Sequence, residues 1–502
     1  PALLPWLQYL AWSSTGASSA SLARWSERLS PWLILHLLMP LASGGPSRAA
    51  VLSGAFGLPL SNNFLERAGW VGLPALAFAV LAAARRPRDG EVRFHAGLAL
   101  FGLAAALGVP PLPRLWRILP GFSMANPTRL LLMFCFGAAT LAGLACDPEG
   151  EAASPRLLAW LGALALLALV VDFAAVGRVW GQLLPGEQGF AAGQAAAFVL
   201  EALVAGALLR KPAWRRWAAL PAALFLLRPA SLVNVPAPAS LLYPATPGTR
   251  ALAAAQGHGR FLGVGPVLAP DAGMPLGLRD VRGVDFAGLR RYQELVTGRD
   301  GDFGFWERAD TLSLPPSLIA LSALAVSPRR PGRIPPGWSA ADYGDLLVYR
   351  APAPGRRALF VPTAEIAVPA QALAAVRAPG FDPAKVVWLD DWFAAPQMSG
   401  ARGSARITRD EADEVDVEVS ADGPGWLVLL DSWYPGWRVS VDGRLASLRR
   451  ADYAFRAVAV PGGVSKVRFT FSPWPLWIGL FLAALSAAGL AFVGWTDRFP
   501  LV

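Results

Sequence analysis

The sequence is poor in cysteine and histidine for a chain of 502 residues, with 2 and 3 of them respectively. Cys135 and Cys146 fall in one predicted helix, about 16 Å apart along its axis, which is too far for a disulfide. The histidines, His36, His95 and His258, are scattered and match no Cys/His metal spacing. These absences exclude a disulfide-stapled fold and a zinc site of clustered cysteine and histidine.

Charge is scarce as well. Only 16% of the residues are charged and 54% are hydrophobic, whereas a soluble domain has about 25% charged residues. The deficit is concentrated in runs of roughly 16–22 residues, long enough to cross a hydrocarbon core of about 30 Å. The composition therefore predicts an integral membrane protein with a large soluble part.

The net charge is +10. No basic helix or interleaved aromatic patch of the kind that binds nucleic acid stands out, so no nucleic-acid partner is predicted. Positive loops on the inner side of a membrane account for the excess of basic residues. Contact with anionic lipid or a lipid phosphate is the other interpretation.

Seven apolar runs are predicted to span the membrane. They cover residues 69–84, 94–109, 129–145, 157–176, 190–209, 217–233 and 475–495. The first six belong to a transmembrane bundle over residues 69–234. The seventh lies in residues 473–502, which end in a short cytoplasmic tail.

Residues 1–68 are predicted to form an external loop with interfacial helices. Within them, the run 32–41 is too short to span a membrane. The chain begins at Pro1, and its first residues resemble the middle of a loop. We therefore expect a C-terminal portion of a longer protein, with earlier membrane helices missing.

Basic residues gather in two predicted loops. Residues 85–93 hold four arginines, and residues 210–216 hold three arginines and one lysine. Both loops lie on the same side by parity, and the positive-inside rule makes that side cytoplasmic. The acidic loop 146–156 opposes this orientation weakly. Residues 235–474 are then predicted to be external, as is the N-terminal loop.

The external region is predicted to have two parts. Residues 235–400 mix short helical and strand-like runs in an α/β domain. Residues 401–472 alternate as strands in a small antiparallel β-sandwich, with an Asp442-Gly443 pair typical of a type I′ turn. The expected strands are residues 415–419, 426–430, 437–441, 455–460 and 467–471. The fold class is thus an α-helical polytopic membrane protein with an external α+β region.

Residues 431–443 read Asp-Ser-Trp-Tyr-Pro-Gly-Trp-Arg-Val-Ser-Val-Asp-Gly. This order resembles the terminal signature of the YfhO-like family of bacterial polytopic membrane proteins. Residues 322–326 depart from the family by being rich in alanine, and the family's N-terminal helices are absent. Similar blocks follow the family's order at residues 63–66, 70–74, 119–122, 126–129, 283–285, 291–292 and 453–471.

The resemblance covers essentially the whole chain and implies a GT-C-type glycosyltransferase of the bacterial cell membrane. Such an enzyme moves a sugar from a polyprenyl-phosphate donor to an envelope polymer on the external face. The implied partners are membrane lipid, the lipid-linked sugar donor and the polymer acceptor. The sequence leaves open whether a divalent cation is a cofactor, because it offers no cluster of metal ligands. The main acid of GT-C enzymes lies in the first external loop, which the resemblance places before this chain.

Sugar transfer needs a carboxylate that activates the acceptor hydroxyl and cations that stabilise the departing phosphate. Glu66, in an external loop just before a span, is the acidic candidate, and surface pairing with Arg67 is the alternative. Arg114, Arg117 and Arg129 surround the external ends of the second and third spans. Their guanidinium groups match phosphate oxygens. Contact with lipid head groups is the alternative, as is a hydrogen bond at a helix N-terminus for Arg129.

Glu201 lies inside the fifth predicted span, with Gln194 on the same face seven residues earlier. An ionisable group in a span is costly and marks either a function or a buried partner. A polar path through the bundle is the functional interpretation. A pair with Arg228, or a protonated buried acid, is the structural one.

Trp433, Tyr434 and Trp437 are candidates for stacking on sugar rings. Filling the sandwich core or packing on the membrane face is the alternative for these aromatic side chains. Two other functions also stay open from the sequence. One is a transporter or flippase for a lipid-linked precursor, and the other is a non-catalytic envelope scaffold that binds glycan.

Overall fold

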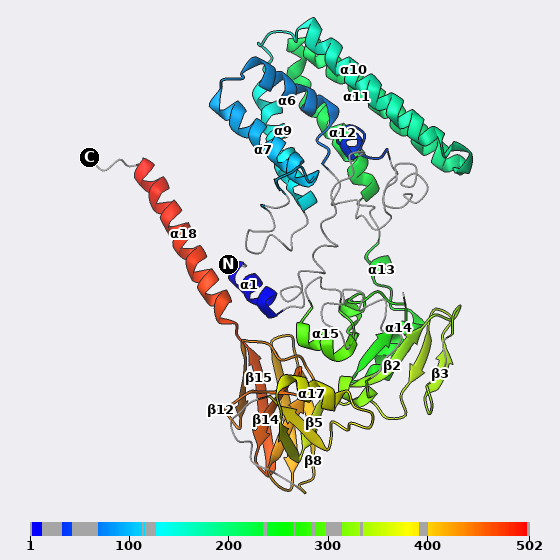
Figure 1. Cartoon of the computed structure of the whole chain (residues 1–502), viewed down its shortest axis with the longest axis vertical. Coiled ribbons are helices and arrows are strands. Elements are labelled where there is room, and N and C mark those ends of the chain that lie inside the picture. Colours follow the sequence, from blue (N-terminus) through cyan, green and yellow to red (C-terminus); the bar gives the residue numbers. More distant parts are fainter. Residues whose placement is uncertain are drawn as a thin grey trace. The chain divides into compact units, whose positions relative to one another are not determined.

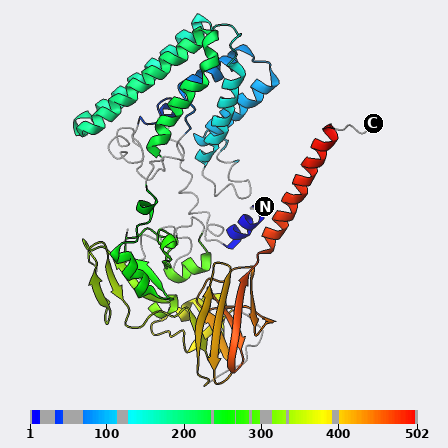
Figure 2. The same cartoon turned by 180° about the vertical axis from the view of Figure 1, so that it is seen from behind.

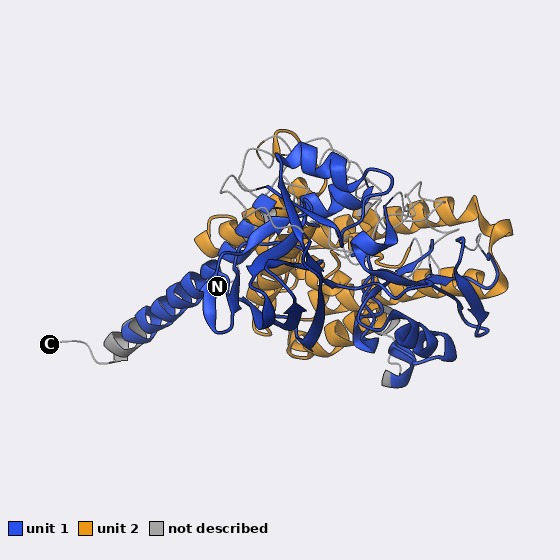
Figure 3. Cartoon of the chain, turned by 90° about the horizontal axis from the view of Figure 1, so that it is seen from below, with its two compact units in different colours: residues 1–22, 238–502 blue, residues 23–237 orange. Residues whose placement is uncertain are grey.

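The computed structural model describes residues 3–12, 33–42, 69–112, 115, 127–233, 238–265, 267–283, 288–297, 314–331, 335–390 and 400–498. The chain divides into two compact units, coloured separately in Figure 3. The helical unit spans residues 23–237. The β-rich unit combines residues 1–22 with residues 238–502.

Helices build the described part of the helical unit (Figure 1). Asp89 and Ser154 accept first-turn backbone N–H groups at the starts of α7 and α10, as N-cap residues do. The helices are α3 (Leu33–Leu38), α6 (Leu73–Arg85), α7 (Gly90–Ala106), α9 (Leu131–Ala145), α10 (Pro155–Gly177), α11 (Pro185–Arg210) and α12 (Ala219–Val233), with the 3-10 turns η3 (Pro127–Leu130), η4 (Trp180–Gln182) and η5 (Pro212–Trp217).

Helices α7 and α9 pack with their backbones almost in contact. A Cβ atom added at Gly102 would lie 2.6 Å from the carbonyl oxygen of Leu130. One added at Gly137 would lie 2.6 Å from the carbonyl oxygen of His95. Small residues that permit such close approach are typical of helix contacts in membranes.

Four helices in the described residues are long and apolar enough to cross a membrane, so the chain is compatible with a membrane protein that has a β region. The other three predicted spans are helices too, but α6, α7 and α12 have only 13, 17 and 15 residues. Thirteen residues reach about 20 Å, short of a core of about 30 Å. The four longer segments are Pro127–Ala145, Pro155–Gly177, Pro185–Arg210 and Trp474–Phe492.

The loops that follow α6, α9 and α11 meet at one end of the helical unit. Arg85 donates to the carbonyl oxygen of Glu151 at 2.7 Å. Arg215, which is buried, donates to the carbonyl oxygens of Asp147 at 3.0 Å and Glu151 at 2.7 Å. Both arginines, which the sequence analysis counted as loop charges, donate to backbone carbonyl oxygens.

The β-rich unit begins with a four-stranded sheet in the order β1-β2-β4-β3. Strands β1 and β2 are parallel, and the other pairs are antiparallel. Ala323 and Ala325 of β2 are fully buried in the cluster that contains Leu252 of α14. The elements are α13 (Ala239–Leu242), α14 (Pro247–Gln256), β1 (Arg260–Gly263), η6 (Met274–Leu276), β2 (Leu321–Val326), β3 (Ser339–Asp342) and β4 (Leu347–Arg350).

Two further sheets form a β-sandwich, seen from both sides in Figures 1 and 2. The five-stranded sheet has the order β12-β11-β15-β9-β8, and the six-stranded sheet has the order β5-β10-β14-β13-β7-β6. The strands are β5 (Ala358–Val361), β6 (Thr363–Ile366), β7 (Val386–Leu389), β8 (Gly403–Asp410), β9 (Glu414–Ala421), β10 (Gly425–Leu429), β11 (Trp437–Val441), β12 (Arg444–Ala446), β13 (Arg449–Ala451), β14 (Phe455–Val460) and β15 (Gly463–Phe471).

Strand β10 is buried along its whole length because both faces of its sheet are covered. Leu427 and Leu429 face the five-stranded sheet, in a core shared with Val417 of β9. Trp426 and Val428 belong to the opposite core, which includes side chains of the helices α15 (Arg290–Thr297) and α17 (Pro369–Val376) and the turn η7 (Pro316–Ile319). The region is therefore layered as sheet, sheet and helices.

All five strands expected between residues 401 and 472 are present as β9, β10, β11, β14 and β15. Asp442 and Gly443 both have positive φ, as a type I′ turn requires. The boundary predicted at residue 400 divides one sheet, because β5, β6 and β7 precede it and β10, β13 and β14 follow it. The sandwich thus recruits strands from the region assigned to the preceding domain.

Two helices complete the β-rich unit. Helix α18 (Trp474–Arg498) follows β15 directly, and α1 (Leu3–Trp12) packs beside it (Figure 1). The indole nitrogen of Trp477 donates to the hydroxyl of Ser472 at 3.0 Å, which ties the start of α18 to the end of the sandwich. The chain's described N-terminal helix and its last apolar helix therefore lie in the same unit.

Candidate functional site

An apolar groove runs over the helical unit between α3, α6, α9, α10 and α11. Every described residue that lines it is apolar or glycine, including Leu76 of α6, Gly162 of α10 and Ala205 and Gly206 of α11. The groove has an empty volume of about 1150 Å³, part of which is open to the surroundings. Such a surface suits a hydrocarbon chain, and its described lining offers no polar side chain to a sugar or a nucleotide.

Glu201 of α11 lies next to this groove at the start of α6. Its Oε2 accepts the backbone N–H of Leu73, a groove residue, at 3.3 Å. Gly72, the N-cap residue of α6, provides no side-chain cap. The buried carboxylate of α11 therefore caps the N-terminus of α6 from a neighbouring helix, where the helix dipole favours negative charge.

The surroundings of Glu201 combine both interpretations drawn from the sequence. Arg228 of α12 attracts the carboxylate electrostatically and donates to the carbonyl oxygen of Gly193 at 3.1 Å. Gln194 is buried on α11 together with Glu201. These contacts give the ionisable group in α11 a structural role, and they keep two polar side chains inside an apolar bundle.

Asp172 of α10 is a second buried acid. Its side chain is only 5% exposed. Its Oδ1 has no hydrogen-bond partner among the described residues. The signal that could have singled it out is the carboxylate itself inside an otherwise apolar run, since such groups are expensive in a membrane.

The predicted phosphate-binding and acidic candidates fall unevenly on the structure. Arg129 is exposed in η3, at the start of the membrane-length segment Pro127–Ala145. Glu66, Arg114 and Arg117 lie outside the described residues. The proposed grouping of these four residues therefore stays a prediction.

Asp431 is the centre of an ion-pair network in the β-rich unit. Its carboxylate bonds Arg260 at 2.6 Å, Arg357 at 2.7 Å and Arg456 at 3.3 Å. Arg357 also bonds Asp410 at 2.6 Å. Because these residues come from β1, β8, β14 and the loops beside them, the network joins the four-stranded sheet to the sandwich.

The network fixes the charge state of its members. Burial alone would raise the pKa of the Asp431 carboxyl, but Arg260, Arg357 and Arg456 outweigh it and hold that pKa well below its ordinary value. Burial lowers the pKa of Arg456 to about 10, against the attraction of Asp431. A carboxylate held ionised by three cations is a poor general base, because its affinity for a proton is low.

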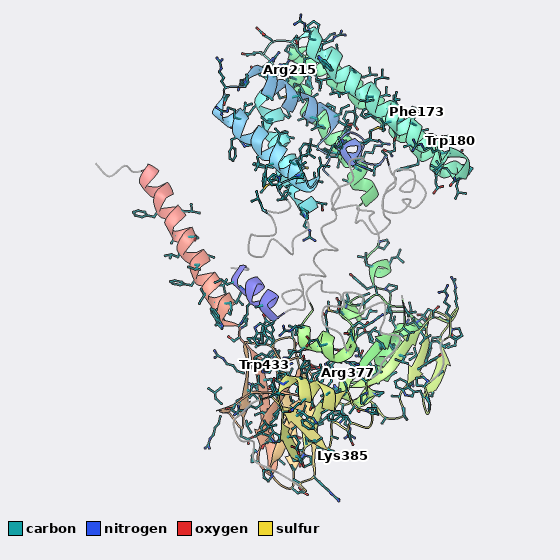
Figure 4. The ribbon with its side chains drawn as sticks, viewed as in Figure 1. Phe173, Trp180, Arg215, Arg377, Lys385 and Trp433 are labelled. Carbon is teal, nitrogen blue, oxygen red and sulfur yellow. The ribbon has the colours of Figure 1, made fainter. Side chains whose placement is uncertain are left out.

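The three aromatic candidates lie close to one another, but other side chains already contact their rings. The guanidinium of Arg450 lies 4.0 Å from the ring centre of Trp433, and that of Arg456 lies 3.8 Å from the ring centre of Trp437. Tyr434 and Trp437 both contact Phe471. Figure 4 shows Trp433 near the end of the sandwich from which α18 leaves. The arginine partners are residues that the sequence analysis missed.

Within the described residues, no group of three or more histidine, cysteine, aspartate or glutamate side chains is placed to hold a metal ion. Comparisons with protein-family models, with curated proteins and with solved structures found no match. The fold itself defines a class, namely a protein with membrane-length apolar helices and a C-terminal region of β-sheets.

Proposed function

We propose that the chain belongs to the YfhO-like family and is a GT-C-type membrane glycosyltransferase with about seven spans. It moves a sugar from a polyprenyl-phosphate donor to a polymer of the bacterial envelope, and its β-rich unit is external. The observation that carries this proposal is the apolar groove of the helical unit. A polyprenyl donor needs an apolar site for its hydrocarbon chain, and the apolar lining of the groove supports the proposal.

The proposed reaction uses few groups. The acceptor hydroxyl attacks the anomeric carbon of the donor, the bond from that carbon to the phosphate oxygen breaks, and polyprenyl phosphate leaves. Glu66 takes the hydroxyl proton unless the main acid lies in a preceding loop. Arg129, with Arg114 and Arg117, neutralises the departing phosphate. A divalent cation is an alternative source of that neutralisation.

Two glycines of α11 allow the role of the groove in donor binding to be tested without disturbing the helices. A Cβ atom added at Gly206 would meet no heavy atom within 4 Å, although Gly206 lines the groove. Gly206→Leu therefore fills the groove without a backbone clash. Gly189→Leu is the matched control, because Gly189 lies exposed on the same helix, outside the groove, and is equally open.

The experiment measures transfer of labelled sugar from polyprenyl phosphate to envelope polymer in membranes that carry the protein. We expect Gly206→Leu to raise the KM for the donor at least tenfold and Gly189→Leu to leave it unchanged. Arg129→Ala should weaken donor binding in the same assay. If no label reaches any envelope polymer with the unmodified protein, the glycosyltransferase proposal fails.

Transport of a lipid-linked precursor is the second candidate, and Asp172 is the observation in its favour. A buried carboxylate in a membrane-length helix is typical of ion-coupled carriers. Reconstituted vesicles with a fluorescent polyprenyl-linked lipid would separate the two functions. Movement of the lipid between leaflets that Asp172→Asn abolishes would favour transport, and its absence with sugar transfer intact would favour the enzyme.

A further inference from the structure

A recess in the β-rich unit gathers positive charge between aromatic rings. Three arginines line it, Arg290 and Arg291 of α15 and Arg450 of β13. Trp12 of α1 and Trp433 contribute rings to the same recess. Its described lining also includes Leu289, Tyr292, Ser432 and Ala454, and it contains no acidic side chain.

Two acidic side chains that do not line the recess pair with its arginines. Asp390 bonds Arg450 at 3.1 Å and also pairs with Arg291. Glu294 lies 3.9 Å from Arg290. Among these five residues, three cations face two anions, so one positive charge is in excess. Burial first, and then the neighbouring Arg291, lower the pKa of Arg450, whereas Asp390 acts in the opposite direction.

The N-terminus of α15 adds to this charge. Leu289, Arg290, Arg291 and Tyr292 are the first residues of the helix or precede it, and all of them line the recess. The first backbone N–H groups of a helix have no partner within it and carry partial positive charge. Together with guanidinium groups, they form the kind of surface that binds a phosphate.

The recess lies beside the root of the last membrane-length helix. Trp12 ends α1, the helix that packs on α18, and its ring lies 5.3 Å from that of Trp433. The guanidinium of Arg450 lies 5.3 Å from the ring centre of Trp12. Tryptophan and arginine at the end of a spanning helix are typical of the membrane interface, where lipid head groups lie.

We propose that this recess, built by Arg290, Arg291, Arg450, Trp12 and Trp433, binds the phosphate group of a membrane lipid. Guanidinium forks and a helix N-terminus recognise a tetrahedral phosphate, and the position beside α18 makes a lipid its source. This proposal does not depend on which reaction the protein catalyses, and it goes beyond the proposed glycosyl transfer. A polyprenyl phosphate and an anionic phospholipid share the chemistry that it recognises.

The test is native mass spectrometry of the full chain in a neutral detergent, with two matched lipid pairs. Phosphatidic acid is compared with diacylglycerol of the same chains, and polyprenyl phosphate with the corresponding polyprenol. Arg290→Gln is the main variant, because Arg290 is 46% exposed and makes one long ion pair within the described residues, so its loss should spare the fold. Arg406→Gln on β8, 71% exposed, is the charge-matched control.

We expect Arg290→Gln to weaken binding of both phosphate-bearing lipids by about tenfold, the loss typical of a hydrogen bond to a charged group. Arg406→Gln should leave binding unchanged, and the phosphate-free lipids should bind equally to all variants. Arg450→Lys, which keeps the charge and removes the guanidinium fork, should show a similar loss.

Two results would overturn the proposal. Equal lipid binding by Arg290→Gln and the unmodified protein would show that the recess is not the lipid-binding site. Displacement of the lipids by equimolar inorganic phosphate would show that free phosphate, and not a lipid, is the ligand. Failure of the proposed function is a separate outcome, since lipid binding that depends on Arg290 would persist in a protein that transfers no sugar.

Discussion

Asp431→Asn gives the largest expected effect on the stability of the β-rich unit. The carboxylate bonds Arg260, Arg357 and Arg456, whose side chains are 13%, 6% and 4% exposed. Asparagine keeps the volume and one acceptor oxygen but removes the charge. Within the described residues, Arg357 keeps Asp410, whereas no other ion pair with a carboxylate is recorded for Arg260 or Arg456.

Removal of one member of a buried ion pair costs about 3–5 kcal/mol, because the remaining charges stay buried without compensation. For a unit of this size, that corresponds to a fall in Tm of roughly 6–20 °C. Asp416→Asn is the matched control, since Asp416 pairs at 2.9 Å with Arg468, which is 56% exposed. Such a surface pair is screened by solvent and contributes little to stability.

The assay is thermal unfolding of both variants in one detergent, with hydrogen exchange followed in peptides from β10 and β14. We expect Asp431→Asn to lower Tm and to speed exchange in both strands, and Asp416→Asn to change neither. Equal Tm values for the two variants would refute the account of Asp431 as a structural clamp. Loss of sugar transfer by Asp431→Asn with unchanged Tm and exchange would instead give the residue a direct role in chemistry.

Three further predictions follow from buried groups and close contacts. Burial raises the pKa of Asp452 to about 7, above an unfolded value of about 3.9, so its contribution to stability is complete below about pH 4 and lost as the pH rises to about 7. Thermal unfolding across this range should show that decline, and Asp452→Asn should remove it, because asparagine stays neutral and tolerates the positive φ. Gly137→Leu should lower the Tm of the helical unit by forcing α9 from a backbone carbonyl of α7, whereas Gly143→Leu on the same helix, with no atom within 4 Å of its Cβ, should not. Glu201→Ala should cost about 1 kcal/mol more than Glu201→Gln in the same measurement, because only the amide can still accept the N–H of Leu73.

The sequence was sufficient for the parts of the fold that local pattern determines. Residues 414–421 alternate buried and less buried side chains, and they form β9 as the period of two predicted. The pair Asp442-Gly443 forms its turn because both positions adopt positive φ. Each of these features needs only residues that are neighbours along the chain.

The rest of the fold depends on residues far apart in the sequence. Strands β5, β6 and β7 have four residues each, too few to identify a sheet partner, and β5 pairs with β10. Arg260 and Asp431 are 171 residues apart, yet they form an ion pair. Glu201 caps a helix that begins 128 residues earlier. No local period encodes these partners, so the recess around Arg450 and the capping of α6 by Glu201 could not be predicted.

The segment from Asp431 to Trp437 connects the ion-pair network to the root of α18, and this position accounts for its unusual composition. Gly436 has φ 112°, and its carbonyl oxygen accepts the backbone N–H of Ser472 at 2.9 Å. A Cβ atom there would lie 3.0 Å from Phe471 and from Pro473, so a side chain would push the sandwich away from the residues that start α18. A side chain at Gly436 therefore alters how the last helix leaves the sandwich. Lost activity in such a variant is evidence for catalysis only if the hydrogen exchange of β11 and β15 is unchanged.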